Sequence, residues 1–292
     1  MEIFIGIIEQ GMIYAVMALG VYITYKILDF PDLTVDGSFP LGAAVTAILI
    51  SNGVHPILAL LVATAAGALA GMVTGLIHVK AGVRDLLSGI ISMTALYSIN
   101  LHIAGKANLS IMTEDTIFRN GLIQGLPEAV QPYTTMIVVC VIALLAKLVL
   151  DWYLRTKSGY LLRAVGDNAT LVTSLAKDSG TVKIVGLAIA NALVALGGAI
   201  MCQQQRFFEA SMGTGTIVIG LASVIIGTNL FRRSRLKATT AVIIGSLLYK
   251  ACVAGAIACG MRAIDMQLIT AALFLVILIL GKERKKKVKT HA

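Results

Sequence analysis

Long apolar stretches separated by short polar or basic segments recur along the whole sequence. A helix of about 20 apolar residues spans the hydrocarbon core of a bilayer. Stretches of about this length lie at about 3–25, 57–79, 85–104, 134–153, 182–204, 213–231, 237–259 and 264–281. This pattern predicts an all-α polytopic membrane protein.

The composition excludes the main alternatives to a membrane protein. Only 13% of the 292 residues are charged, about half the share in globular domains, so too few are available to cover a soluble fold. The 58% hydrophobic residues exclude intrinsic disorder. Four cysteines spread along the chain form no disulfide framework, and we expect them to pack inside the spans.

A shorter apolar segment, 38–53, follows a run of acids and helix breakers at 28–38. Non-helical backbone at membrane depth persists only where protein buries it or water reaches it. The run is therefore either a discontinuous membrane element or a cytoplasmic loop with solvated acids. If 38–53 crosses the bilayer as a broken helix that starts near Pro40, the count is nine transmembrane helices; otherwise it is eight.

Basic residues gather in a few connecting segments, although the net charge is +9 overall. The positive-inside rule places such segments in the cytoplasm. It predicts a cytoplasmic C-terminus, an N-terminus outside and outward loops at 105–133 and 205–212. No aromatic-interleaved basic face is present, so we expect no nucleic-acid partner. The basic segments are 80–84, 155–183, 232–237 and the tail 282–292.

Two charged residues lie inside predicted spans, Glu9 in 3–25 and Lys250 in 237–259. A charge at the bilayer centre costs about 2.5–3.5 kcal/mol on insertion scales. With the predicted topology both lie toward the outer face. They therefore pair with each other or face a solute pathway, unless Lys250 extends its ammonium to the interface.

The span 85–104 carries polar residues on every side of its helical wheel, from Ser88 to His102. Unpaired polar groups are costly in hydrocarbon, so this helix is central. It either lines a wet path or makes interhelical hydrogen bonds. We expect the substrate pathway to include Glu9, Asp36, Tyr97, Asn100 and Lys250.

Glycine recurs at every fourth position in 67–75, at Gly67, Gly71 and Gly75. Small residues at this spacing let two helix backbones approach closely in a membrane. The glycine face either packs against another helix of the same chain or forms a subunit contact.

Motifs for chemistry of its own are missing from the sequence. It contains no Gly-x-x-x-x-Gly-Lys-[Ser/Thr] phosphate loop, no His/Cys cluster with metal-ligand spacing and no Gly-x-Ser-x-Gly elbow. We therefore expect a non-catalytic chain that binds no cofactor or metal.

The basic loop 155–181 contains a candidate docking helix. Asp167 or Asn168 is suited to cap a helix that runs to about Lys177 and ends at Gly180. Leu171 and Leu175 share one face of that helix at i, i+4 spacing. Such a helix is suited to dock in a groove on a partner protein.

Several segments of the sequence resemble those of a known protein family. The segments TKSG at 156–159 and LRAVGDN at 162–168 closely resemble the cytoplasmic segment of branched-chain-amino-acid-type ABC permeases. LDFPDLTVDGSFPLG at 28–42, MTALYSINL at 93–101 and IGSLLYK at 244–250 resemble the sub-branch of tryptophan and other aromatic-amino-acid importers. The match covers nearly the whole chain in the expected order.

The resemblance implies a permease in the bacterial plasma (inner) membrane, with one domain at 1–281. It implies a second permease copy as a homodimer, two cytoplasmic ATPases that bind ATP and Mg²⁺, and a solute-binding lipoprotein or periplasmic protein outside. The solute is expected to be an aromatic amino acid. The coupling helix that contacts the ATPase is then expected to use Arg163, Gly166, Asp167, Asn168, Leu171 and Leu175.

Two other functions fit an apolar chain of this kind. An ion-coupled secondary transporter would use Glu9 and Asp36 as proton or cation sites, and the single chain would then transport without ATP. A membrane scaffold would show no solute flux in any complex.

Overall fold

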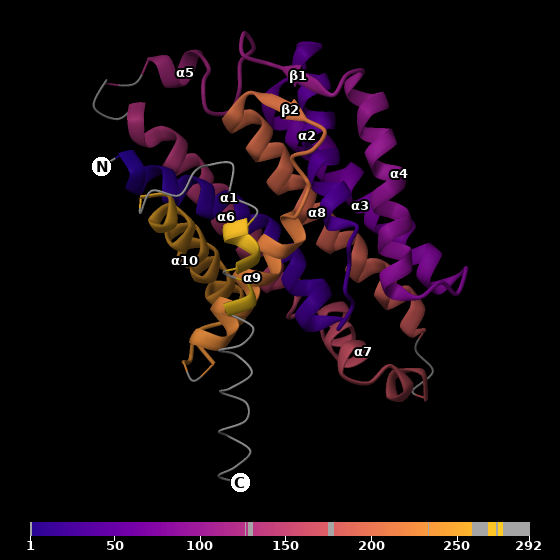
Figure 1. Cartoon of the computed structure of the whole chain (residues 1–292). Coiled ribbons are helices and arrows are strands. Elements are labelled where there is room, and N and C mark those ends of the chain that lie inside the picture. Colours follow the sequence, from indigo (N-terminus) through magenta and orange to yellow (C-terminus); the bar gives the residue numbers. More distant parts are fainter. Residues whose placement is uncertain are drawn as a thin grey trace.

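The computed structural model describes residues 2–125, 127, 131–174, 178–232, 234–258, 268–272 and 274–276. Within this part the chain is a bundle of tilted helices with one small sheet at an end (Figure 1).

The described helices confirm an all-α polytopic membrane protein. Six are long and apolar enough to cross a membrane: α1 (Glu2–Tyr22, extended by the π-helix η1, Ile23–Ile27), α3 (Pro56–Val79), α4 (Asp85–Ala104), α6 (Gln131–Tyr153), α8 (Ser179–Gln205) and α10 (Ala238–Ala258). Two shorter apolar helices are α2 (Val35–Ser51) and α9 (Thr216–Leu230). These eight match eight predicted segments. The ninth, 264–281, lies mostly outside the described residues, so the count of eight or nine stays a prediction.

The chain is broken between α1 and α2, as the discontinuous interpretation of 28–38 predicts. Residues 28–34 are not helical, and Asp29 has a φ of 51°. Asp29 is exposed, but Asp32 is only 1% exposed and Asp36 is half-buried. The alternative interpretation of 28–38, a cytoplasmic loop whose acids are solvated, is therefore wrong for Asp32 and Asp36.

Helix α2 begins at Val35, earlier than predicted, so Pro40 lies inside the helix and not at its start. A proline has no N–H to donate to the carbonyl four residues before it, here that of Asp36. The loop residue Gly213 packs against this site. A Cβ at Gly213 would lie 2.1 Å from the backbone carbonyl oxygen of Asp36 and 2.6 Å from Pro40 Cδ. The absence of a side chain at Gly213 lets the loop before α9 approach the proline-containing turn.

The glycine face of α3 packs against α8 of the same chain. A Cβ at Gly67 would lie 2.3 Å from Ala195 Cβ, and one at Gly71 would lie 2.2 Å from the Leu187 carbonyl oxygen. The interpretation as packing within the chain is confirmed, and α8 occupies the face that a subunit contact would need. Helix α8 lies in the middle of the bundle and packs most closely against α3 and α2 (Figure 1).

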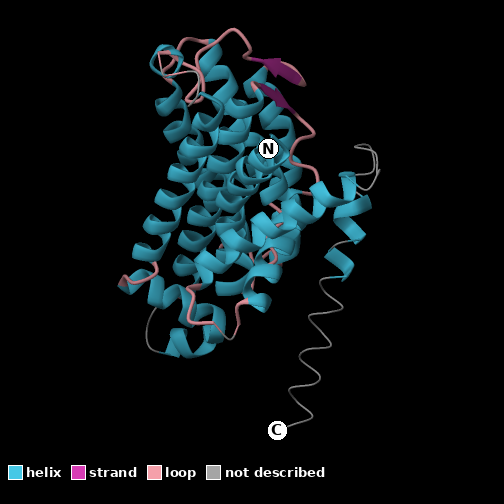
Figure 2. Ribbon diagram, turned by 90° about the vertical axis from the view of Figure 1, so that its left-hand side faces the viewer, coloured by secondary structure: helices cyan, strands magenta, loops and turns pink. Residues whose placement is uncertain are grey.

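The two ends of the bundle differ. Strands β1 (Asn108–Ser110) and β2 (Phe207–Glu209) pair antiparallel at one end, near the short helix α5 (Gly121–Gln124). Helix α7 (Lys157–Ser174) lies at the opposite end (Figures 1 and 2). The loops predicted to face outward thus share one end.

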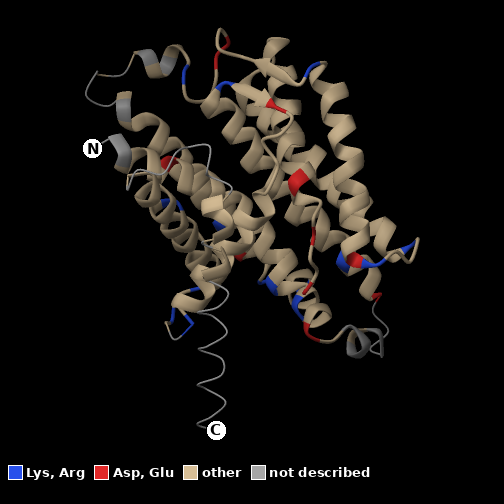
Figure 3. Cartoon of the chain, in the orientation of Figure 1, with Lys and Arg blue, Asp and Glu red and all other residues tan. Residues whose placement is uncertain are grey.

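The end with α7 also carries the turn between α3 and α4 and the loop before α10, both with Lys or Arg (Figure 3). The segments that the positive-inside rule assigns to the cytoplasm therefore lie together. Which end faces the cytoplasm stays a prediction.

Candidate functional site

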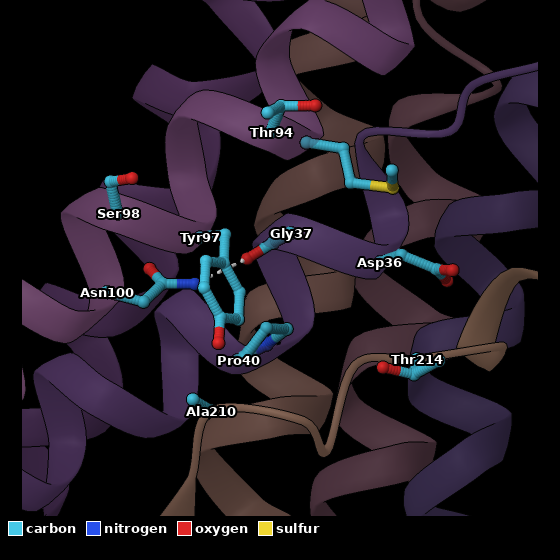
Figure 4. Close-up of a pocket in the computed structure, with 10 residues that line it drawn as sticks. Asp36, Gly37, Pro40, Thr94, Tyr97, Ser98, Asn100, Ala210 and Thr214 are labelled. Carbon is cyan, nitrogen blue, oxygen red and sulfur yellow. Dashed lines mark hydrogen bonds between the residues drawn. The ribbon is translucent and has the colours of Figure 1, made fainter. Parts of the chain in front are cut away.

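A cavity of about 380 Å³ lies where the start of α2, the middle of α4 and the loop before α9 meet (Figure 4). This volume falls within the range of small-molecule sites. The lining residues are Asp36, Gly37, Pro40, Met93, Thr94, Tyr97, Ser98, Asn100, Ala210 and Thr214. Three of the five predicted pathway residues therefore come together, although 28–42 and 93–101 are distant in sequence.

Asp36 binds the first turn of α9. Its Oδ1 accepts hydrogen bonds from the Ile217 N–H at 2.7 Å and the Thr216 hydroxyl at 2.9 Å. Its Oδ2 accepts one from the Gly215 N–H at 3.1 Å. The free N–H groups of a helix start favour a carboxylate. Asp36 therefore joins α2 to α9, and both of its oxygens have partners.

Asn100 lines the cavity, although only 1% of its surface is exposed. Its Nδ2 donates to the Gly37 carbonyl oxygen at 3.1 Å (Figure 4). Its Oδ1 has no hydrogen-bond partner within the part of the chain that the structure describes. A buried acceptor without a partner costs about 1–3 kcal/mol, so Asn100 offers an acceptor that a donor can satisfy.

Tyr97 lies on the cavity side of α4, with 53% of its surface exposed, between Thr94 and Ser98 in sequence. The opposite face of α4 is different: the Ser92 hydroxyl accepts a hydrogen bond from Thr74 of α3 at 2.7 Å. Hydrogen bonding between helices therefore holds on the face toward α3, while the path stays a prediction. The predicted central position of this helix is wrong in the described structure, because α4 packs mainly on α2 and α3 and much of its remaining surface is exposed.

A buried polar network that the sequence interpretation missed holds the non-helical linker in place. Asp32 Oδ2 accepts a hydrogen bond from Asn191 Nδ2 of α8 at 2.8 Å, and Oδ1 accepts one from the Thr34 N–H at 2.9 Å. The Thr34 hydroxyl lies 2.9 Å from the Thr74 hydroxyl. The signals in the sequence were Asn191 and Thr74, polar residues inside mostly apolar spans.

Glu9 and Lys250 lie away from the cavity and do not pair. Lys250 is 6% exposed, and its Nζ lies 3.3 Å from Gln10 Oε1 and 4.1 Å from the centroid of the Tyr14 ring. No ion pair joins it to Glu9 in the described structure. The predicted pairing is therefore wrong, and extension of Lys250 to the interface is wrong because the side chain is buried.

Comparison with known proteins settles the family. A family model for the permease component of branched-chain amino acid transport systems matches residues 3–280. The chain belongs to this family. The residues that carried the resemblance, at 28–42, 93–101, 156–168 and 244–250, all lie inside the matched region.

Individual relatives of this permease extend the comparison. A tyrosine transport system permease protein of Clostridioides difficile (strain R20291) is 43% identical over 289 residues, covering 99% of this chain and 94% of the relative. An uncharacterized protein of Rickettsia prowazekii (strain Madrid E) is 33% identical, covering 92% and 94%. A ribose import permease protein of Escherichia coli (strain K12) is 25% identical, covering 76% and 68%. No solved structure matches the chain.

The predicted coupling segment of the permease forms α7 at the end opposite the sheet. The helix is kinked at Asn168, whose φ of −159° and ψ of 91° are extended. An extended residue before a helical turn is the geometry of an N-cap, so a new helical piece begins at Asn168, as predicted. The preceding piece, from Lys157 to the kink, was not predicted.

Several predicted coupling residues of the permease are exposed, namely Arg163, Asp167 and Asn168. Gly166 instead packs on the end of η1, where a Cβ would lie 1.7 Å from the Ile27 carbonyl oxygen. The Leu171 side chain and all of Leu175 lie outside the described residues.

The predicted helix end at Gly180 is wrong, because Gly180 lies in the first turn of α8. Asp178 caps that turn: its carboxylate accepts hydrogen bonds from the Thr181 hydroxyl and from the Gly180 N–H at 2.9 Å. These bonds, that of Thr181 first, hold the pKa of Asp178 below its ordinary value.

Proposed function

We propose that this permease is the transmembrane subunit of an ATP-driven importer whose solute is an aromatic amino acid resembling tyrosine. The observation that carries the proposal is the relative named for tyrosine transport, which is 43% identical over 99% of this chain. An extracytoplasmic binding protein would deliver the solute to the end with the sheet.

The chemistry of the cavity supports an amphipathic solute of this size. Tyr97 and Met93 supply an aromatic ring and a thioether, which favour contact with a ring. The Thr94 and Ser98 hydroxyls and the unpaired Asn100 Oδ1 supply polar partners, of which the amide oxygen suits an ammonium donor. Asp36 positions the cavity wall because its oxygens are already used by α9.

The exposed residues of α7 support an ATPase contact at the other end of the bundle. Two ATPases would each contact one permease copy through Arg163, Asp167 and Asn168. Leu171 and Leu175 would add apolar contacts. ATP and Mg²⁺ would bind the ATPases, so the permease itself catalyses no reaction. The N-terminus would then lie outside and the C-terminus in the cytoplasm.

Uptake by the reconstituted complex tests the solute. Permease, ATPase and binding protein are placed in proteoliposomes with ATP inside, and uptake of labelled tyrosine, tryptophan, leucine and ribose is compared. We expect the two aromatic solutes to be taken up, and Tyr97→Ala to lower their uptake at least about tenfold, which corresponds to about 1.4 kcal/mol. Tyr133→Ala is the matched control, because Tyr133 is exposed but lies outside the cavity.

Two results would contradict the proposal. Preferential uptake of leucine or ribose would remove the aromatic solute while leaving the importer intact. Uptake by the permease alone without ATP would support the ion-coupled transporter instead.

A further inference from the structure

A second, basic cavity of about 350 Å³ lies at the end of the bundle that carries α7. It is formed where the last turn of α6, the first turns of α7 and the start of α10 meet. Three cations line it, Arg155, Arg163 and Lys237, against the single carboxylate of Asp151. The solute cavity and the predicted pathway do not include this site, which shares Arg163 alone with the predicted coupling residues.

The carboxylate of Asp151 is fully engaged and leaves both arginines unneutralised. It lies 3.3 Å from Lys147 Nζ and 3.0 Å from Lys237 Nζ, and it accepts a hydrogen bond from the Thr239 hydroxyl at 2.6 Å. Within the described residues no ion pair reaches Arg155 or Arg163. Two guanidinium groups thus line one cavity without an ion pair to its carboxylate.

Guanidinium groups match phosphate in shape and charge, because they donate in a planar fork. Basic pockets between transmembrane helices at the membrane surface are suited to lipid headgroups. Tyr160, 60% exposed, also lines the cavity and adds a hydroxyl. The ligand chemistry is therefore a phosphate group.

The exposed face of α6, the helix that leads into the cavity, favours a lipid phosphate over a free one. Leu145, Leu148, Val149 and Trp152 of α6 are 49–70% exposed and recur at i, i+3, i+4 and i+7, so they form one apolar stripe. The stripe ends beside Asp151, in the last turn of a membrane-spanning helix. Trp152 at that place is typical of the membrane interface.

We propose that this cavity binds the phosphate headgroup of an anionic lipid through Arg155 and Arg163, with the acyl chains on the α6 stripe. This inference rests on the membrane position of α6 and not on the solute. It gives the permease a lipid site on the segment that joins α6 to α7.

Trp152 is the only tryptophan of the sequence and reports on this site directly. The full-length permease is placed in phosphatidylcholine vesicles, and quenching of Trp152 fluorescence by brominated phosphatidylglycerol is compared with quenching by brominated phosphatidylcholine. We expect phosphatidylglycerol to quench equally at a mole fraction at least about fivefold lower, since a basic residue near an anionic surface contributes about that factor.

Variants separate a built site from general attraction. Arg155→Gln with Arg163→Gln is expected to abolish the preference, while Lys157→Gln, an exposed cation outside the cavity, keeps it. Unchanged quenching by brominated phosphatidylcholine shows that each variant remains inserted.

Three results would overturn the proposal. The first is equal quenching by the two lipids. The second is an equal loss of preference in Lys157→Gln, which would indicate surface attraction alone. The third is release of brominated phosphatidylglycerol by millimolar inorganic phosphate, which would make free phosphate the ligand.

Discussion

At the scale of single residues, Asp36 holds together two helices that are distant in sequence. Asp36→Asn keeps the shape of the side chain, but it removes the charge and turns an N–H donor toward the Gly215 N–H. We expect the unfolding free energy in detergent to fall by about 1–3 kcal/mol, measured by thermal or denaturant unfolding.

Asp29→Asn is the matched control, because Asp29 is exposed in the same linker. Full stability of Asp36→Asn together with lost transport would contradict the structural role and indicate direct contact with the solute.

Asn100→Leu tests the cavity wall. The substitution removes one hydrogen bond to Gly37 and also removes a buried acceptor without a partner, so we expect little change in stability. Uptake is expected to slow at least about tenfold, measured in proteoliposomes with the amount of assembled complex held equal. Unchanged uptake would show that Asn100 is structural only.

Polar and charged residues inside the predicted spans could be identified from the sequence, but the residues that contact them could not. Asn100 and Lys250 are conspicuous inside apolar spans. The partner of Lys250 depends on how α1 and α10 are rotated, and the rotation brings Gln10 and Tyr14 to it in place of Glu9. Asp36 meets Ile217 only through packing of segments about 180 residues apart.

At the scale of elements, the close contact of α3 with α8 predicts a sensitive position. Gly71→Ala forces a methyl group toward the Leu187 carbonyl, and overpacking costs about 1–3 kcal/mol. We therefore expect the Gly71→Ala variant to unfold at a lower denaturant concentration than the unsubstituted permease. Gly6→Ala is the control, because no atom lies within 4 Å of its Cβ position; equal effects of the two substitutions would contradict the packing argument.

Helix α7 predicts a different phenotype, a loss of coupling. Leu171→Asp is expected to leave assembly intact while solute uptake falls at least about tenfold relative to ATP hydrolysis, because the proposed apolar contact with the ATPase is lost. Both rates are measured on the same complex. Ser158→Asp, exposed in the first turn of α7, is the control, and normal transport by Leu171→Asp would remove the coupling role.

The existence and order of the helices were predictable, because bilayer thickness fixes their length. Their ends were less so. Glycine is the residue type typical of a helix C-terminus, which suggested that a helix ends at Gly180. Asp178 instead caps the start of α8, so Gly180 lies in the first turn of that helix. Pro40 suggested a helix start, but the loop at Gly213 accommodates it inside α2.

At the scale of the whole molecule, the sorting of loops to two ends predicts their sidedness. In a background without native cysteines, Met112→Cys, near the sheet, is expected to react with a membrane-impermeant maleimide in intact cells. Lys157→Cys, on α7, is expected to react only after permeabilisation. Both positions are exposed, so the reverse pattern would invert the proposed orientation.

The sorting of the loops to two ends and the family were predictable from the basic segments and the motifs. The cavity was not, because it forms only when segments from three parts of the chain pack together. The carboxylate of Asp36 gives that cavity a mechanical property. It joins the start of α2 to the start of α9, so we expect these two cavity walls to move together in any change of shape of the cavity.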